Sequence, residues 1–502
     1  MSISTTKSTV IATMKEVTEG TLILPSAGTD FIPPTGYPEL SPNIELLDNN
    51  ELRGSIGKAK GISGIETPMA SFGLYLKASG VEGQSPNYGE LLEGVFGATT
   101  VQSTARTTAA ASTTSVVKLA AGGSDYARGK AMLNKDSVYS IRPVHSVSTN
   151  DVTLGFNLTS APPISVTCGK FVNFSPANSG HPSVSVIRYS GNEHSVDAIA
   201  GGKVTKFDLK ADAGSLIEST VELTGTKYFF DLIEITSSTE VIDFLDDATT
   251  RAASVTVKAY KTPHELASAL ASAMNALGSS NTFSVSYNDN GANAGKFTIA
   301  SSGTTLTLKW NTGTNTASSI ASKIGFSTAA DSSAALTYTS ATVQSWVAPY
   351  TVSFDAADPL VAKNNEVFLG DSTDNVNFCA SSLSITFENE NSAVKCIGAE
   401  GGIDSNFFSG RTATITVTGR LDKHDADLIN RFLNNSDTRF MYNAGEKSGG
   451  NWVAGKCVSV YVPTCSVTSY KMTDLDGIVG VEIELKSFVD SSGNGEVYLN
   501  FL

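Results

Sequence analysis

Side chains that could carry out chemistry are few and scattered in this sequence. The 502 residues include five histidines and five cysteines, and no two cysteines form a CxxC pair. His145 and His181 lie far from any acidic residue at metal-ligand spacing, and His264-Glu265 lacks the second histidine of an HExxH motif. No Ser/His/Asp, Cys/His or paired-carboxylate arrangement stands out. We therefore expect no catalytic residue, no metal site and no cofactor, and a protein that is not an enzyme.

A glycine-rich basic stretch, ELRGSIGKAKGISG, comes nearest to a nucleotide-binding motif. A phosphate loop requires GxxxxGK followed by Ser or Thr, whereas Gly57-Lys58 is followed by Ala59. We interpret the stretch as a flexible hairpin and take Arg53, Lys58 and Lys60 as candidates for contact with a neighbouring subunit. A solvated loop is the simpler alternative.

The overall composition argues against tight binding of nucleic acid. Acidic residues outnumber basic residues, 49 to 35, whereas a protein that holds a phosphate backbone shows the opposite excess. The few, widely spaced cysteines predict buried free thiols formed in a reducing cytosol. The N-terminus lacks the apolar core of a signal peptide, and no segment approaches the roughly 18 apolar residues of a membrane span. We expect a soluble protein without membrane contact.

The predicted elements are strands that have one dry face, followed by helices. From Thr412 to Thr418 threonines alternate with apolar residues, which is the period of a half-buried strand. Gly419 ends this pattern, and an amphipathic helix is predicted from Leu421 to Leu433 that could cover the sheet's apolar face. A second strand and helix are predicted earlier, with the helix running from Ser85 to Phe96.

Two strand pairs resemble each other across the chain. TVELTG (220–225) resembles TITVTG (414–419), and KFDLK (206–210) resembles SITFE (384–388). The first pair is offset by 194 residues and the second by 178, which predicts about 16 extra residues in the second copy, around 398–411. We interpret this as one fold used twice. The alternative is chance similarity between short Thr/Val strands.

These patterns predict a mainly β (α+β) fold with several domains. The predicted division is an N-terminal arm (1–40), a discontinuous first domain (41–111 and 185–237), an inserted β domain (112–184), an inserted α+β decorating domain (238–345) and a second domain of the first type (346–502).

The arrangement resembles the tail tube proteins of long-tailed, siphovirus-like bacteriophages, in particular the group whose chain carries the tube fold twice. The resembling segments are ELRGSIG with GLYLKASG, the region from IAGGKVTKFDLK to TVELTG, and the region from LSITFENENSAVKCIG to DLDGIVGVEIELKSF. The resemblance implies two β-sandwich or half-barrel tube domains, each flanked by a helix. It also implies a structural virion protein whose rings stack into a hollow tail tube that conducts DNA from capsid to host.

The resemblance further implies partners and a location. The partners would be copies of the chain itself, the tail terminator, tape measure and tail-tip proteins, and genome DNA that passes without specific binding. The virion tail would be assembled in the host cytoplasm. In the resembled family, tube proteins with a single copy of the fold close with six subunits. Two copies of the fold per chain therefore imply a trimeric ring that imitates a hexamer, and a true hexamer is the alternative. The DNA channel would be acidic, and Glu222, Glu388, Glu482 and Glu484 are the candidate lumen-facing residues.

Two other functions fit the composition. Ser/Thr-rich β-modules are common in surface adhesins and carbohydrate-binding proteins, although the inserted rather than tandem modules argue against them. A tail-tip or baseplate ring of the same fold is the other alternative.

Overall fold

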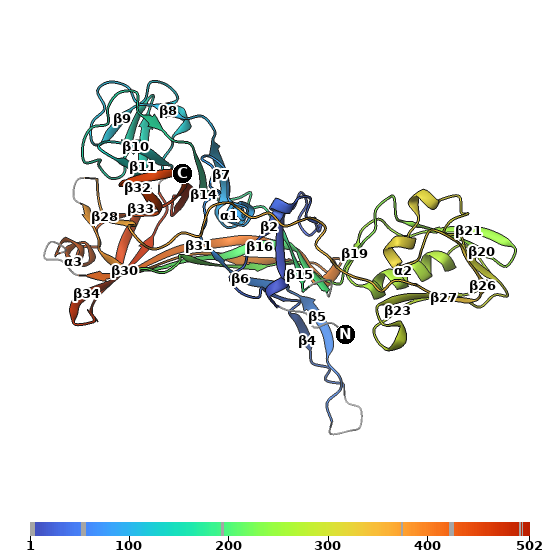
Figure 1. The fold of residues 1–502 in the computed structure, drawn as a ribbon. Coiled ribbons are helices and arrows are strands. Elements are labelled where there is room, and N and C mark those ends of the chain that lie inside the picture. The colour runs from blue at the N-terminus through green and yellow to red at the C-terminus, as the bar shows by residue number, and fades with distance from the viewer. Residues whose placement is uncertain are drawn as a thin grey trace. The chain divides into compact units, whose positions relative to one another are not determined.

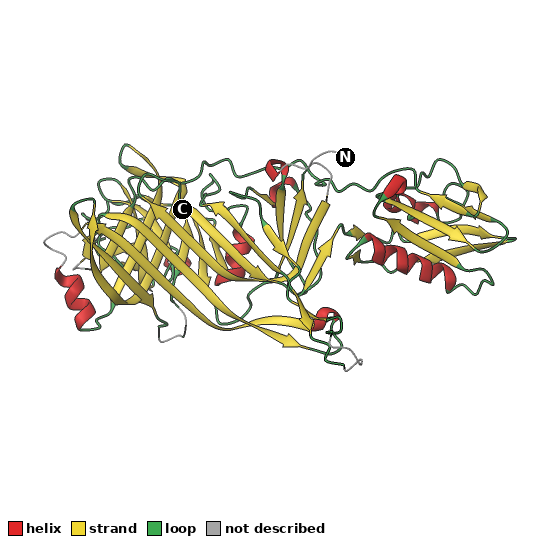
Figure 2. Ribbon diagram, turned by 90° about the horizontal axis from the view of Figure 1, so that it is seen from below, coloured by secondary structure: helices red, strands yellow, loops and turns green. Residues whose placement is uncertain are grey.

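The computed structural model describes residues 6–51, 57–191, 195–372, 375–420, 426–490, 493 and 495–502. Within these ranges the chain is mainly β-strand, as Figures 1 and 2 show, so the expected fold class is confirmed. The α-helices of the described ranges are α1 (Gly89–Phe96), α2 (Pro263–Asn275) and α3 (Ala426–Leu433).

The chain divides into two compact units. The first consists mainly of Tyr228–Pro349, with Ile187–Ile199 and the N-terminus up to Val10. The second contains Ile11–Val186, Ala200–Lys227 and Tyr350–Leu502.

The second unit is built on one antiparallel sheet, which we call the long sheet. Its strands, in spatial order, are β3 (Glu39–Ser41), β6 (Met69–Tyr75), β17 (Glu218–Thr224), β16 (Ser195–Asp212), β30 (Ala380–Lys395), β31 (Ile403–Arg420), β34 (Ile478–Ser487) and the C-terminal half of β33 (Asn451–Leu475). Apolar residues alternate with polar ones along each strand, as a sheet with one dry face requires. Leu209, Ile385, Ile415 and Leu485 form one such row of direct partners, and all are buried.

The long sheet contains the same four-stranded arrangement twice. In chain order the first copy runs β3, β6, α1, β16, β17, and the second runs β30, β31, α3, β33, β34. In space the first copy is ordered β3-β6-β17-β16, and the second β30-β31-β34-β33. The two copies therefore share one topology and lie side by side, joined where β16 pairs with β30.

This topology corrects the strand alignment predicted from the sequence. TVELTG forms β17, the last strand of its copy in chain order, whereas TITVTG lies in β31, the second strand of its copy. KFDLK lies in β16 and SITFE in β30, which are also at different positions. Alternating Thr and Val suits any strand with one wet face, so these similarities arose by chance even though the fold is repeated. The supposed extra residues at 398–411 include the tip of the β30–β31 hairpin.

A second sheet lies in the same unit. Its strands, in spatial order, are β7 (Gly97–Gln102), β14 (Phe171–Pro176), β35 (Tyr498–Phe501), the N-terminal half of β33, β32 (Thr438–Ser448), β28 (Glu366–Gly370) and β29 (Asn375–Asn377). Strand β14 lies within the predicted insertion 112–184, but it belongs to this sheet because it pairs with β7 and β35. At the N-terminus, β1 (Val10–Lys15) pairs with β2 (Phe31–Ile32) and with β15 (Val184–Ser190).

The rest of the predicted insertion forms small sheets, and their core is shared with the second sheet through Trp452 and Cys457 of β33. One sheet contains β10 (Ala131–Lys135), β11 (Tyr139–Ser148), β12 (Asp151–Leu154) and β9 (Val116–Lys118), and the other pairs β8 (Arg106–Thr107) with β13 (Thr167–Cys168). Val117, Ile141 and Val152 are fully buried in this core.

Helix α1 packs on the apolar face of the long sheet where the two copies meet. Phe96 stacks on Phe387 of β30, with ring centroids 4.8 Å apart, and lies 6.5 Å from the ring of Phe207 on β16. Asn389 Nδ2 donates to the carbonyl oxygen of Val95 at 2.8 Å, near the helix C-terminus. The helix begins at Gly89 rather than at the predicted Ser85, and residues 87–88 form a turn.

Helix α3 follows β31 as α1 follows β6, and it lies against β33. The predicted helix began at Leu421, but residues 421–425 lie outside the described ranges. The prediction that its apolar stripe covers the sheet is wrong for its last turn, because Phe432 is 37% exposed and Leu433 is 70% exposed.

The first unit is an α+β module around α2. Its sheets are β21 (Thr249–Ser254), β20 (Val241–Asp246), β25 (Leu306–Leu308) and β26 (Ser332–Ala335); β23 (Phe283–Asn288), β24 (Lys296–Ser301) and β27 (Thr337–Thr339); and β19 (Ile233–Glu234) with β22 (Ala259–Tyr260). Thr262 caps α2, because its side-chain hydroxyl accepts a hydrogen bond from the Glu265 N–H at 3.1 Å. Trp310, Leu266 and Phe297 are buried in its core.

Candidate functional site

The surface with the most organised chemistry is the face of the long sheet opposite its apolar rows, which we call the polar face. Glu222, Glu388, Glu482 and Glu484, predicted from separate segments, all project on this face. Threonines of β31 fill its centre, between Thr412 and Thr418. The alternation in each strand was enough to assign these side chains to a polar face, but their assembly on a single surface depends on strand pairing.

A lysine at the junction of the two copies links carboxylates of three strands. Lys206 Nζ lies 2.9 Å from Asp208, 3.7 Å from Glu388 and 3.8 Å from Glu222. The hydrogen bond to Asp208, aided by the two other carboxylates, raises the pKa of Lys206. This cluster could not be predicted from the sequence, because its members meet only through the pairing of β17, β16 and β30.

The polar face carries an acidic excess. Apart from the buried Lys203, the described strands hold nine carboxylates and five basic groups on this face: Glu39, Asp208, Asp212, Glu218, Glu222, Glu388, Glu390, Glu482 and Glu484 against Lys206, Lys210, Arg420, Lys471 and Lys486. The strands predicted from sequence would give five acids (Asp208, Glu222, Glu388, Glu482 and Glu484) against four lysines (Lys77, Lys206, Lys210 and Lys486), which is nearly balanced. The structure adds four acids to this face and places Lys77 beyond the end of β6.

Both edges of the long sheet are open in the described chain. From Ser466 to Leu475, β33 pairs with β34 on one side and with no described strand on the other. At the opposite edge β3 pairs with β6 alone. Such edges carry unpaired backbone donors and acceptors and favour the addition of another strand.

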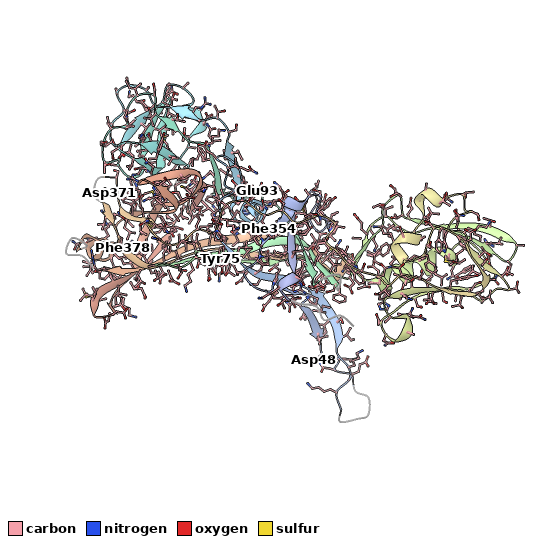
Figure 3. The ribbon with its side chains drawn as sticks, viewed as in Figure 1. Asp48, Tyr75, Glu93, Phe354, Asp371 and Phe378 are labelled. Carbon is pink, nitrogen blue, oxygen red and sulfur yellow. The ribbon has the colours of Figure 1, made fainter. Side chains whose placement is uncertain are left out.

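The basic hairpin predicted from the sequence projects from the connection between β3 and β6. Its strands are β4 (Ile44–Leu47) and β5 (Ile62–Glu66), and Figure 3 labels Asp48 just beyond β4. Lys58 and Lys60 are exposed, whereas Arg53 lies outside the described residues. Leu46 and Ile62 are 73% and 58% exposed, so the hairpin presents apolar side chains as well as basic ones.

The histidines and cysteines of the described ranges do not gather into one cluster. Burial and the nearby Arg439 and Arg128 lower the pKa of His145 to about 4. The ring nitrogens of His181 lie 3.1 and 3.0 Å from backbone carbonyl oxygens. The five cysteines are free thiols; Cys168, Cys457 and Cys465 are buried, but Cys379 and Cys396 are exposed, contrary to expectation. Among the described residues, no group of three or more His, Cys, Asp and Glu is placed to hold a metal ion.

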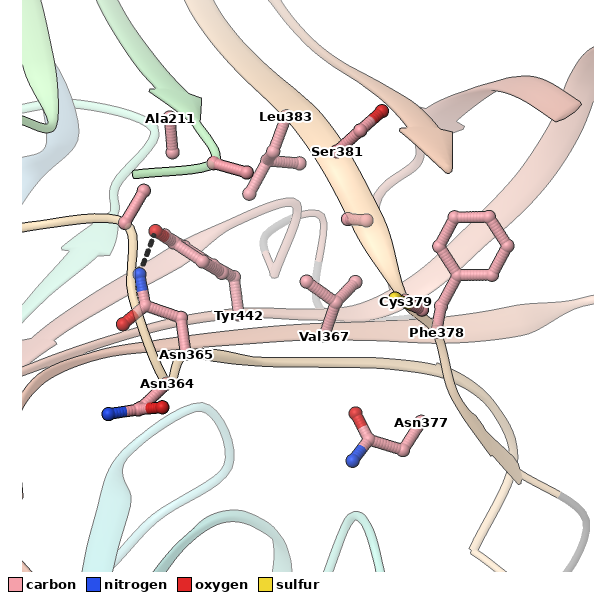
Figure 4. A pocket seen from close by; sticks show the side chains of 13 residues that line it. Ala211, Asn364, Asn365, Val367, Asn377, Phe378, Cys379, Ser381, Leu383 and Tyr442 are labelled. Atoms are coloured by element: carbon pink, nitrogen blue, oxygen red, sulfur yellow. Dashed lines mark hydrogen bonds between the residues drawn. The ribbon is translucent and has the colours of Figure 1, made fainter. Parts of the chain in front are cut away.

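A pocket of about 410 Å³ lies where β30 begins (Figure 4). Ala211, Val367 and Leu383 contribute apolar surface, and Asn365 Nδ2 donates to the Tyr442 hydroxyl at 2.8 Å. The lining residues carry no charged side chain, so this pocket does not suggest an ionic ligand or acid–base chemistry. In the part of the chain that the structure describes, no helix is long and apolar enough to cross a membrane.

Comparison with known proteins agrees with the resemblance found in the sequence. Residues 6–231 match the family model described as phage tail tube protein. This match supports a structural protein of the bacteriophage virion tail. A search of curated proteins found no match.

Proposed function

We propose that this phage tail tube protein closes into rings that stack into a hollow tube, with the polar face lining a channel through which DNA passes. The observation that carries the proposal is the repeated topology of the long sheet. Strand β33 occupies in the second copy the place that β16 has in the first, and β3 corresponds to β30. The pairing of β16 with β30 is therefore a template for pairing of β33 with β3 of the next chain.

This pairing satisfies both open edges at once. Each chain offers β33 at one end of its sheet and β3 at the other, so the contact is head-to-tail and can close into a ring. The closed barrel has no free edge, which removes the unpaired backbone groups. With two copies per chain, three chains supply six equivalent units, and we propose a trimeric ring that imitates a hexamer.

The charge of the polar face suits a channel for DNA. An excess of carboxylates repels phosphates, so DNA slides through without forming the cation–phosphate contacts that dominate nucleic-acid affinity. Lys206 is already surrounded by three carboxylates and offers little net attraction to a phosphate.

The β4–β5 hairpin is proposed to contact the next ring, through Arg53, Lys58 and Lys60 and the exposed apolar side chains of its strands. The corresponding connection in the second copy is the short turn between β30 and β31. Three hairpins per ring would therefore alternate with three short turns, and exact sixfold symmetry would be absent at the ring–ring contact. Tail terminator, tape measure and tail-tip proteins would meet the tube at its ends, after assembly in the host cytoplasm.

Electron microscopy of the purified protein tests this function, alone and with tail initiation proteins. Long hollow tubes are expected. Rings that never stack would instead favour a tail-tip or baseplate ring, and a persistent monomer with glycan affinity would favour an adhesin.

A further inference from the structure

The last turn of α3 is an apolar surface that nothing in the described chain covers. Phe432 and Leu433 are 37% and 70% exposed, and Met472 on the adjoining strand β33 is 61% exposed. Met472 pairs with the buried Val481, so it projects from the apolar side of the sheet rather than from the polar face. The apolar face is thus incomplete at this edge.

Helix α1 of the first copy occupies the place that α3 has in the second copy, but its apolar residues are covered. Helices α1 and α3 have the same length, and both place apolar residues third, fourth, seventh and eighth, in GELLEGVF and ADLINRFL. Aligned in this way, Val95 corresponds to Phe432 and Phe96 to Leu433. Whereas Phe432 and Leu433 are exposed, Val95 and Phe96 are at most 1% exposed.

The difference lies in the neighbouring strand. Phe96 reaches across the junction and stacks on Phe387 of β30, which belongs to the second copy. Asn389 of the same strand donates to the Val95 carbonyl oxygen at 2.8 Å. Helix α1 therefore connects the first copy to the second. Helix α3 has no further copy of the four-stranded arrangement next to it in its own chain.

We propose that Phe432 and Leu433 dock on a second copy of this chain, over the junction between β33 and the partner's β3. This inference rests on the proposed ring and adds to it a helix clamp that crosses each subunit boundary. The partner's β3 supplies an apolar residue on the required side: Leu40 pairs with the buried Ala70 and is itself only half-buried in the isolated chain. Docking would cover the α3 surface and Leu40 together.

Substitution tests the clamp directly. Leu433→Asp alters an exposed side chain, so the subunit should remain folded, as circular dichroism can verify. We expect the concentration needed for ring formation to rise at least about tenfold, equivalent to a loss of about 1.4 kcal/mol per contact. Ile164→Asp is the matched control, because Ile164 is 63% exposed and lies outside α3 and the long sheet; it should assemble normally.

Paired cysteines locate the contact. In a background with Cys379 and Cys396 changed to Ser, chains carrying Leu433→Cys are mixed with chains carrying Leu40→Cys and treated with a short bis-maleimide. A heterodimer is expected from this mixture, and none from Leu433→Cys mixed with Ile164→Cys. Normal rings that give no Leu433–Leu40 crosslink and tolerate Leu433→Asp would overturn the clamp while leaving the tube intact. A wild-type chain that forms no ring would overturn both.

Discussion

Leu209 of β16 lies directly opposite Ile385 of β30, and this pair joins the two copies of the four-stranded arrangement into one sheet. Both side chains are at most 4% exposed, so the junction between copies is as well buried as the interior of either copy. The same type of junction, repeated between chains, predicts how many chains close a ring. Two four-stranded copies per chain predict three chains.

Native mass spectrometry or end-on imaging of rings should therefore find three full-length chains. The control is the same measurement under conditions that dissociate the ring, which should return monomers. Six chains per ring would mean that each chain contributes only one unit of the wall, and the topological repeat would then have no role in closure.

Removing the ring of Phe96 should destabilise the subunit strongly. Phe96 stacks on Phe387 and contacts the junction of the copies, so Phe96→Ala leaves a cavity at the centre of the long sheet. Substitutions of this kind cost about 3–5 kcal/mol. Thermal unfolding of the monomer should show a large decrease in Tm. Leu433→Ala, at the corresponding position of α3, should change the monomer's Tm little because its side chain is exposed. Equal decreases for the two variants would contradict the difference in burial.

The sequence predicted the strands and their faces well, but not their partners. Alternation from Thr412 to Thr418 revealed the dry side of β31, because period-two burial is a local property. The match of TVELTG to TITVTG was misleading for the same reason: strands with one wet face resemble each other wherever they lie. The helix pattern was more informative, since α1 and α3 do occupy equivalent places. The carboxylates around Lys206 could not be predicted, because three strands distant in sequence bring them together.

The first unit should be more stable in mild acid than at neutral pH because of Asp231. Burial, with a smaller contribution from Asp197, raises the pKa of Asp231 to about 7 from its ordinary 3.8. Between these values the folded state holds a proton that the unfolded state has lost, so stability falls as pH rises through this range. Asp231→Asn should raise the Tm of this unit at pH 8 and have little effect at pH 4. The amide keeps an acceptor for the Val196 N–H and tolerates the φ of 52°.

Asp247→Asn is a control of opposite sign. Asp247 has the same φ of 52°, but hydrogen bonds from Asn281, Thr304 and Thr305 lower its pKa. Its contribution is present above its ordinary pKa and is lost as pH falls through the lower, folded value. The substitution should therefore lower the Tm at pH 8. If both variants shifted the Tm in the same direction at pH 8, the assignment for Asp231 would be wrong.

The module around α2 should be dispensable for the tube. Trp310, Leu266 and Phe297 belong to a core within the first unit, so we propose that residues 240–340 form a decorating module that folds around its own core. Replacing this span with a short Gly/Ser linker should leave ring and tube formation intact. Ile233 and Ile235 pack in the same core and would become exposed, so both should be changed to Ser in the deletion variant. Soluble subunits that no longer form rings would show that the module contributes to the wall.

Reversing two charges on the polar face should slow DNA passage without preventing assembly. The double substitution Glu482→Lys and Glu484→Lys would leave seven acidic and seven basic groups where the described strands now carry nine and five. Added ammonium groups bind phosphates, so DNA would have to break these contacts as it moves. Ejection from phage particles should be slowed about tenfold, which corresponds to about 1.4 kcal/mol in the barrier.

The control is the double substitution Asp358→Lys and Glu446→Lys. It makes the same charge change at two exposed sites that lie outside the long sheet. Higher ionic strength should partly restore the rate of the Glu482/Glu484 variant by screening the new contacts. Ejection at the wild-type rate from fully assembled tails would place Glu482 and Glu484 away from the path of the DNA.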